Sequence, residues 1–150
     1  MITQNDIVDL INSANLAGFE IQNNEIILLQ LNSGIENHIQ PRLPNGFNAV
    51  YIFKYNQMYL KVGKVSANSN PRYQFQHYSA NSNGSTLSKS LINDAYFNNI
   101  INNQVIGEWI KENTTRFNIL IPEILTKNFL HFAEAFFILK CSPRFEDSRA

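Results

Sequence analysis

Two apolar segments separated by a two-residue break constrain the fold of this chain more than any other feature. Residues 49–55 (AVYIFKY) and residues 58–65 (MYLKVGKV) are rich in β-branched and aromatic side chains, and Asn56-Gln57 lies between them. Such side chains favour strands, and a short polar break between two strands is typical of a tight turn. The sequence therefore predicts an antiparallel hairpin.

The chain beyond this hairpin contains patterns of helices, with one further strand. In order, we expect a short helix at 72–78, helices at 85–96 and 105–111, a strand at 116–121 and a long apolar helix at 124–141. Proline at 143 would end the last helix. Together with the hairpin, this order predicts an α+β domain with a small three-stranded antiparallel or mixed sheet flanked by helices.

The N-terminal segment predicts a helix followed by a short hairpin. Thr3 is spaced as a cap for a helix whose apolar residues recur at helical intervals as far as Gly18. Two apolar runs, residues 19–21 and 25–31, then flank the turn-like pair Asn23-Asn24, which is typical of a hairpin.

A proline- and glycine-containing stretch separates this segment from the rest of the chain. Residues 32–48 contain two prolines and two glycines and have little periodicity, which indicates a loop or linker. We place a boundary near residue 42. The prediction is an acidic N-terminal extension over residues 1–41 and a domain over residues 42–150.

Charge is distributed unevenly, although the formal net charge is zero. Residues 1–41 carry five acids and no base, whereas residues 42–93 carry six bases and no acid. A purely positive stretch is a candidate anion-binding surface, and the alternative is six solvated side chains scattered over the molecule. The six bases are Arg42, Lys54, Lys61, Lys64, Arg72 and Lys89.

Other features exclude several classes of protein. A single cysteine excludes a disulfide framework and any metal site with several thiolate ligands. No apolar run approaches the roughly 18 residues that a membrane span needs, and the N-terminus lacks the basic segment of a secretory signal. We therefore expect a cytoplasmic protein without a membrane partner.

Short motifs follow one another in a characteristic order. Ala49-Val50-Tyr51 precedes Lys61-Val62-Gly63-Lys64, and these are followed by Arg72, by Glu134 in the late helix, and by Pro143-Arg144-Phe145. Over residues 46–147, this series resembles the GIY-YIG endonuclease superfamily, in the style of its small, bacterial, restriction-enzyme-like members. Two positions differ from the family pattern, because Lys61 replaces the tyrosine of the second motif and Glu146 replaces the closing asparagine.

The resemblance implies a metal-dependent endonuclease that hydrolyses phosphodiester bonds, with DNA as the expected substrate. It implies that Tyr51 is the general base, that Lys61 and His77 assist proton transfer, and that Arg72 stabilises the phosphate. It also implies that Glu134 binds Mg²⁺ or Mn²⁺.

The chemistry of these side chains can be judged independently of the resemblance. Tyr51 can act as a base only if its pKa falls well below about 10, and nearby Lys61 and Lys64 would lower that pKa. Arg72 can bind a phosphate with two hydrogen bonds at any working pH. A single carboxylate such as Glu134 suits Mg²⁺, which keeps most of its water ligands.

Each assignment has a structural alternative. Tyr51 could be a core aromatic residue beside solvated lysines, Arg72 a surface arginine, and His77 a packing histidine. Glu134 could form an ion pair with Lys127 or a hydrogen bond with His131.

Substrate contacts are also expected from the residues around this centre. The loop at 81–86 leads into a helix start, where amides and hydroxyls can bind phosphate, and aromatic side chains can stack on bases. The alternative is that the loop hydroxyls only cap the helix and that the aromatic rings belong to the core. The predicted substrate-binding residues are Lys64, Tyr73, Ser85, Thr86 and Lys89.

Two further functions compete with the nuclease hypothesis. The neutral net charge and the two departures from the motif favour a module of low activity that binds nucleic acid or a protein partner. The acidic residues 1–41 favour, more weakly, a regulatory protein of toxin–antitoxin type. Under the nuclease hypothesis, residues 1–41 are a candidate surface for a homodimer or a protein partner, or a partial cover of the basic face.

Overall fold

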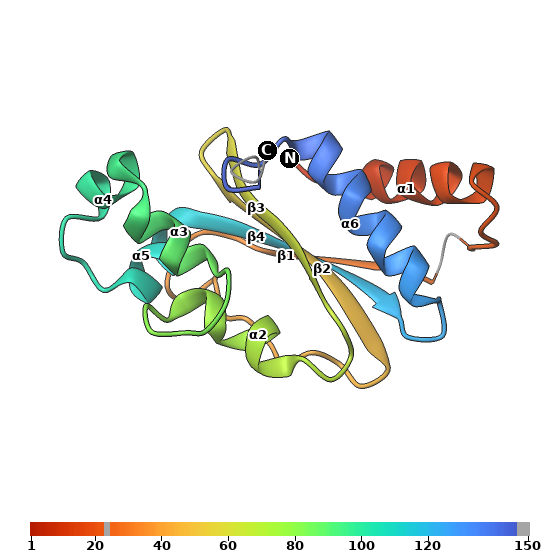
Figure 1. Ribbon diagram of the computed structural model, residues 1–150, viewed down its shortest axis with the longest axis horizontal. Coiled ribbons are helices and arrows are strands. Elements are labelled where there is room, and N and C mark those ends of the chain that lie inside the picture. The colour runs from red at the N-terminus through yellow and green to blue at the C-terminus, as the bar shows by residue number, and fades with distance from the viewer. Residues whose placement is uncertain (23–24, 147–150) are drawn as a thin grey trace.

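A four-stranded antiparallel sheet separates two groups of helices (Figure 1). The computed structural model describes residues 1–22 and 25–146. Its strands are β1 (Ile27–Leu31), β2 (Phe47–Tyr55), β3 (Met58–Val65) and β4 (Thr114–Pro122). Its α-helices are α1 (Gln4–Leu16), α2 (Asn70–Gln74), α3 (Leu87–Asn93), α4 (Ala95–Ile101), α5 (Ile106–Asn113) and α6 (Lys127–Cys141), and a 3₁₀ turn, η1, spans Gln76–Tyr78. The α+β class is confirmed.

The predicted central hairpin is confirmed. Strands β2 and β3 pair antiparallel around a turn at Asn56-Gln57, and Asn56 adopts the positive φ of 51° that such a turn requires. In this register Tyr51 lies opposite Gly63. The pairing shifts after Phe53, as in a β-bulge.

The sheet has one strand more than the three predicted, because the strand order is β1-β4-β2-β3. The expected hairpin at residues 19–31 is wrong: residues 19–22 form no strand, and Ile27–Leu31 pairs with β4 instead. The Asn23-Asn24 pair lies outside the described residues. Strand β4 is long and pairs with β2 along one edge only, so its other edge accepts β1.

One face of the sheet packs against α1 and α6 (Figure 1). The apolar side chains of Val50, Ile52 and Val62 meet those of both helices in a single core. The predicted cap of α1 is confirmed, since the Thr3 amide donates to the Asp6 carboxylate at 2.6 Å. Residues 1–41, expected as an extension, thus contribute a strand to the sheet and a helix to this core.

The other face packs against the helices between β3 and β4. The helix expected at 85–96 is divided at Asp94, whose carboxylate accepts hydrogen bonds from the amides of the next helix and so starts α4. The helix expected at 72–78 is α2 followed by η1, and the late helix begins at Lys127 rather than at 124. Among the described helices, none combines the length and apolarity that crossing a membrane would require.

Candidate active site

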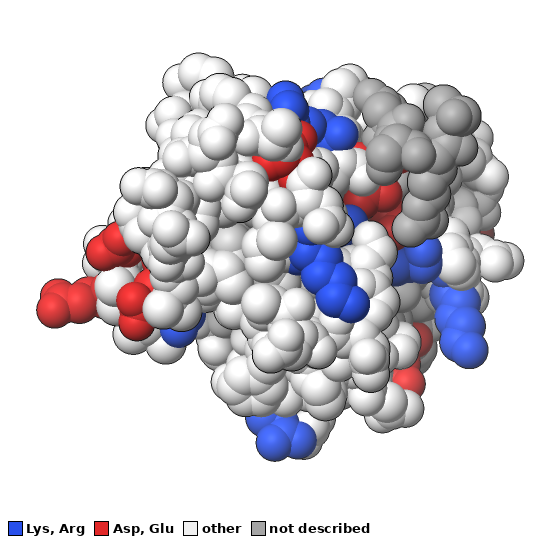
Figure 2. Space-filling model, turned by 60° about the vertical axis from the view of Figure 1, so that its left-hand side comes forward, with Lys and Arg blue, Asp and Glu red and all other residues white. Residues whose placement is uncertain are grey.

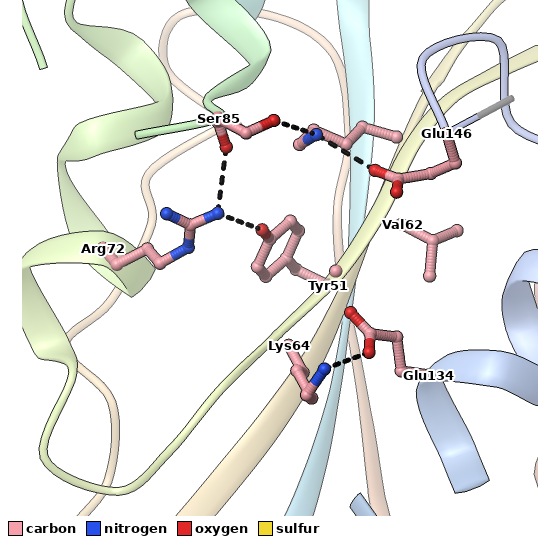
Figure 3. A pocket seen from close by; sticks show the side chains of 9 residues that line it. Tyr51, Val62, Lys64, Arg72, Ser85, Glu134 and Glu146 are labelled. Atoms are coloured by element: carbon pink, nitrogen blue, oxygen red, sulfur yellow. Dashed lines mark hydrogen bonds and ion pairs between the residues drawn. The ribbon is translucent and has the colours of Figure 1, made fainter. Parts of the chain in front are cut away.

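A cavity of about 240 Å³ lies beside β3, at the edge of the sheet (Figure 3). Because β3 is an edge strand, side chains from both of its faces reach this cavity: Lys61 on the face of Tyr51, and Lys64 on the face of α6. The lining residues are Tyr51, Lys61, Val62, Gly63, Lys64, Arg72, Ser85, Glu134 and Glu146. The structure therefore brings together four of the five predicted catalytic residues.

Tyr51 reaches the cavity across Gly63. The tyrosine is only 1% exposed, and its ring lies over the backbone of Gly63. A Cβ atom added at position 63 would be 2.5 Å from the ring carbon Cζ. Glycine is thus required at position 63 because the ring passes directly over the backbone there. This contact explains, in physical terms, why the motif Lys61-Val62-Gly63-Lys64 contains a glycine.

Arg72 binds the phenol oxygen from the opposite side. Its Nη2 donates to Tyr51 Oη at 3.4 Å and to the backbone oxygen of Ser85 at 2.9 Å (Figure 3). Within residues 1–22 and 25–146, no carboxylate forms an ion pair with Arg72. Its charge is therefore available to an anion that enters the cavity.

The expected effect of the two lysines on Tyr51 is wrong. Burial raises the pKa of the Tyr51 phenol above its ordinary value of 10, and the guanidinium of Arg72 offsets this only in part. The two lysines, each paired with a carboxylate, do not bring that pKa below its ordinary value. In the free protein Tyr51 is a neutral phenol.

Lys61 is held by the C-terminal segment. Its Nζ lies 3.0 Å from Glu146 Oε1 and donates to Ser85 Oγ at 3.2 Å, and the residue is 3% exposed. Glu146 thus neutralises Lys61. The sequence alone did not show that these two residues, 85 positions apart, contact each other.

Lys64 forms an ion pair with Glu134 of α6 (Figure 3). The two partners suggested by the sequence, Lys127 and His131, do not bind this carboxylate. Glu134 lines the cavity and already attracts a cation, the Lys64 ammonium. The described residues contain no cluster of three or more histidines, cysteines and acids, so a bound ion would rely on one or two carboxylates and on water, which suits Mg²⁺.

His77 does not line the cavity, although it was expected to assist proton transfer there. It is buried behind Tyr51, with the two rings 4.4 Å apart, and its Nδ1 accepts from the amide of Leu87 at 3.1 Å. Burial and the surrounding cations lower the pKa of His77 well below 6.5. It is therefore a neutral residue that positions the Tyr51 ring.

Three predicted substrate contacts also need correction. Tyr73 and Thr86 are fully buried, so neither side chain can reach a substrate. Thr86 instead caps α3, where its side chain accepts from the amide of Lys89. Lys89 lies outside the cavity wall, whereas Ser85 and Lys64 belong to it.

Arg116 is a residue of this region that the sequence reasoning missed. It is completely buried below Tyr51, donates to Asn118 Oδ1 at 2.8 Å and to the Tyr73 carbonyl at 2.8 Å, and lies 5.5 Å from the centre of the Tyr51 ring. A charged residue inside the apolar strand RFNILI was the available signal.

The predicted positive surface is divided. Two of the six bases of residues 42–93 are paired with acids of the C-terminal half. On the face shown in Figure 2, basic side chains lie in separate groups, several of them beside acidic ones.

Comparisons with known proteins gave no match to this chain, whether against family models, curated proteins or solved structures.

Proposed function

We propose that this protein is a metal-dependent endonuclease that hydrolyses phosphodiester bonds, with DNA as its substrate, in the manner of the GIY-YIG enzymes that its motifs resemble. One observation carries the proposal: Tyr51, Lys61, Arg72 and Glu134 come from four separate elements and line a single cavity. If Tyr51 were only a core residue and the charged side chains were only solvated, nothing would require all four to meet at one cavity.

Arg72 is the phosphate ligand in this proposal. It borders the cavity, has no carboxylate partner among the described residues, and carries a guanidinium that can donate two hydrogen bonds to a phosphate. A guanidinium held by the Ser85 carbonyl is oriented before the substrate arrives, so it can stabilise charge that develops on phosphorus-bound oxygens. Ser85 Oγ adds a neutral hydroxyl to the same wall.

Glu134 is the metal ligand. A divalent ion at this carboxylate would withdraw electron density from the phosphate and lower the pKa of a bound water. The ammonium of Lys64 pairs with this carboxylate in the free protein, so Glu134 could hold a metal ion only if that ion pair opened, which would leave the charge of Lys64 uncompensated.

Tyr51 takes the proton of the attacking water. Its phenol is neutral in the free protein because burial raises its pKa, so it must first release its own proton to water in the cavity, and additional positive charge nearby would favour that release. Arg72 already donates to the phenol oxygen, and Lys64 supplies further charge once its ion pair with Glu134 is broken.

The test is incubation of the purified protein with supercoiled plasmid and Mg²⁺ or Mn²⁺. Wild type and the control variant Glu112→Ala, which removes an exposed acid on α5, should nick the plasmid, and Glu134→Ala should not. Equal nicking by wild type and Glu134→Ala, or none by wild type under any metal, would refute the proposal.

A module that binds nucleic acid or a protein partner without cutting is the second candidate. It is favoured by the two ion pairs, since Lys61 and Lys64 are both neutralised in the free protein. Metal-independent binding of DNA without cleavage would support this alternative.

A further inference from the structure

A second cavity adjoins the candidate active site. It has a volume of about 340 Å³ and lies between the end of β3, the loop that follows it and α6. Lys64 and Arg72 border both cavities, so the two are immediate neighbours. The remaining lining residues are Asn48, Val65, Ser66, Ser69, Lys127, Leu130 and His131.

The two cavities differ in charge. The first contains the carboxylates of Glu134 and Glu146 beside its cations, whereas the lining of the second contains Lys64, Arg72 and Lys127 and no acid. Within the part of the chain that the structure describes, Lys127 forms no ion pair. Arg72 and Lys127 are thus two cations without a carboxylate partner, and with two serine hydroxyls beside them they favour an anion such as a phosphate.

The spacing along α6 relates this cavity to the scissile bond. His131 and Lys127 precede Glu134 by three and seven residues, which places all three on one side of the helix. At a rise of 1.5 Å per residue, they lie about 4.5 and 10 Å from Glu134 along the helix axis. One strand of DNA rises about 3.4 Å per nucleotide, so these distances correspond to about one to three nucleotides.

We infer that the second cavity binds the backbone of the cleaved nucleic-acid strand, one to three nucleotides from the scissile phosphate, through Lys127 and His131. This inference rests on the proposed function, and it makes the substrate a polymer rather than a small phosphodiester. Lys64 and Arg72, which border both cavities, lie between the scissile phosphate and its neighbour.

The direct test compares Lys127→Gln and His131→Gln with the control Lys111→Gln, which removes a lysine from α5 on the opposite side of the sheet. Binding of a fluorescent DNA duplex is measured without divalent metal over a range of salt concentrations. Loss of one phosphate contact should reduce the slope of log K against log salt by about 0.9, which is about eightfold in affinity at 0.1 M salt. If Lys127→Gln has the slope of the control, the inference is wrong.

A small substrate separates this inference from the proposed function. Bis(p-nitrophenyl) phosphate contains one phosphodiester and no neighbouring phosphate, so Lys127→Gln and His131→Gln should hydrolyse it at the wild-type rate while they cleave DNA more weakly. Equal losses on both substrates would place these residues in the reaction centre and overturn the inference. If wild type hydrolyses neither substrate, the proposed function fails, and the salt slopes alone then decide whether the second cavity binds DNA.

Discussion

Replacement of Gly63 by alanine should displace Tyr51 and so test both the packing and the role of the tyrosine. A Cβ at position 63 would lie 2.5 Å from Tyr51 Cζ and 2.9 Å from Cε2. Carbon atoms in ordinary contact are about 3.5 Å apart, so the ring must move by about 1 Å. The ring is 1% exposed, and His77 and Phe53 pack against it at ring distances of 4.4 and 6.0 Å.

These contacts determine the size of the effect. Overpacking of this kind costs about 1–3 kcal/mol, which lowers the melting temperature of a chain of this length by about 2–12 °C. A shift of about 1 Å in a reacting group costs about 10²-fold in rate. We therefore expect Gly63→Ala to lose about two orders of magnitude in plasmid cleavage, with a moderate loss of stability.

Two measurements on two variants check this reasoning. Cleavage rate and melting temperature are recorded for Gly63→Ala and for the double variant Gly63→Ala/Tyr51→Leu, whose smaller side chain leaves room for the new Cβ. The double variant should recover stability but not cleavage. An unchanged melting temperature in Gly63→Ala would refute the packing argument, and a lower melting temperature with full cleavage would show that the position of Tyr51 does not matter to the reaction.

Four further predictions concern the charged and titratable groups. Glu134→Ala should abolish cleavage but leave DNA binding intact or stronger, whereas Arg72→Ala should weaken both cleavage and binding. Cleavage and fluorescence anisotropy assays measure these effects, and loss of DNA binding in Glu134→Ala would contradict the prediction. Tyr51→Phe should keep its melting temperature and lose about 10²–10⁴ in rate, and any increase of the wild-type rate with pH that reflects ionisation of the Tyr51 phenol should disappear; full activity would exclude Tyr51 as the base. Lys64→Ala should bind Mn²⁺ more tightly in calorimetry, because no ammonium competes for the Glu134 carboxylate; weaker binding would place the metal elsewhere. Burial lowers the pKa of His38 to about 4. Between pH 6.5 and 4, His38 therefore binds a proton in the unfolded chain but not in the folded protein. The free energy of unfolding should fall by about 3 kcal/mol as the pH falls through that range. Urea unfolding of His38→Gln should therefore show a smaller difference from wild type at pH 4.5 than at pH 7.5, and a constant difference would be evidence against a neutral buried His38.

Local patterns in the sequence determined most of the secondary structure. The apolar runs on either side of Asn56-Gln57 specified the β2–β3 hairpin, and Thr3 with Asp6 specified the start of α1, because turns and helix caps depend on residues a few positions apart. The partner of Ile27–Leu31 did not follow from such patterns. Pairing with β4 depends on an edge that exists only after the sheet has assembled.

For the candidate site, too, some features follow from the sequence and others only from tertiary contacts. The order of the motifs in the sequence predicted that Tyr51, Lys61, Arg72 and Glu134 form one centre, and the structure gathers these residues around one cavity. Their electrostatic state was decided by tertiary structure. Lys64 meets Glu134 across 70 residues of chain, and Lys61 meets Glu146 across 85.

Burial reverses the local expectation for Tyr51. Two lysines on a neighbouring strand predict a lowered phenol pKa, but each lysine is neutralised by an acid from the C-terminal segment, and burial raises that pKa instead. The charge that a group experiences depends on every residue packed around it. Chain folding brings those residues together from distant positions, and no local pattern records which of them will meet.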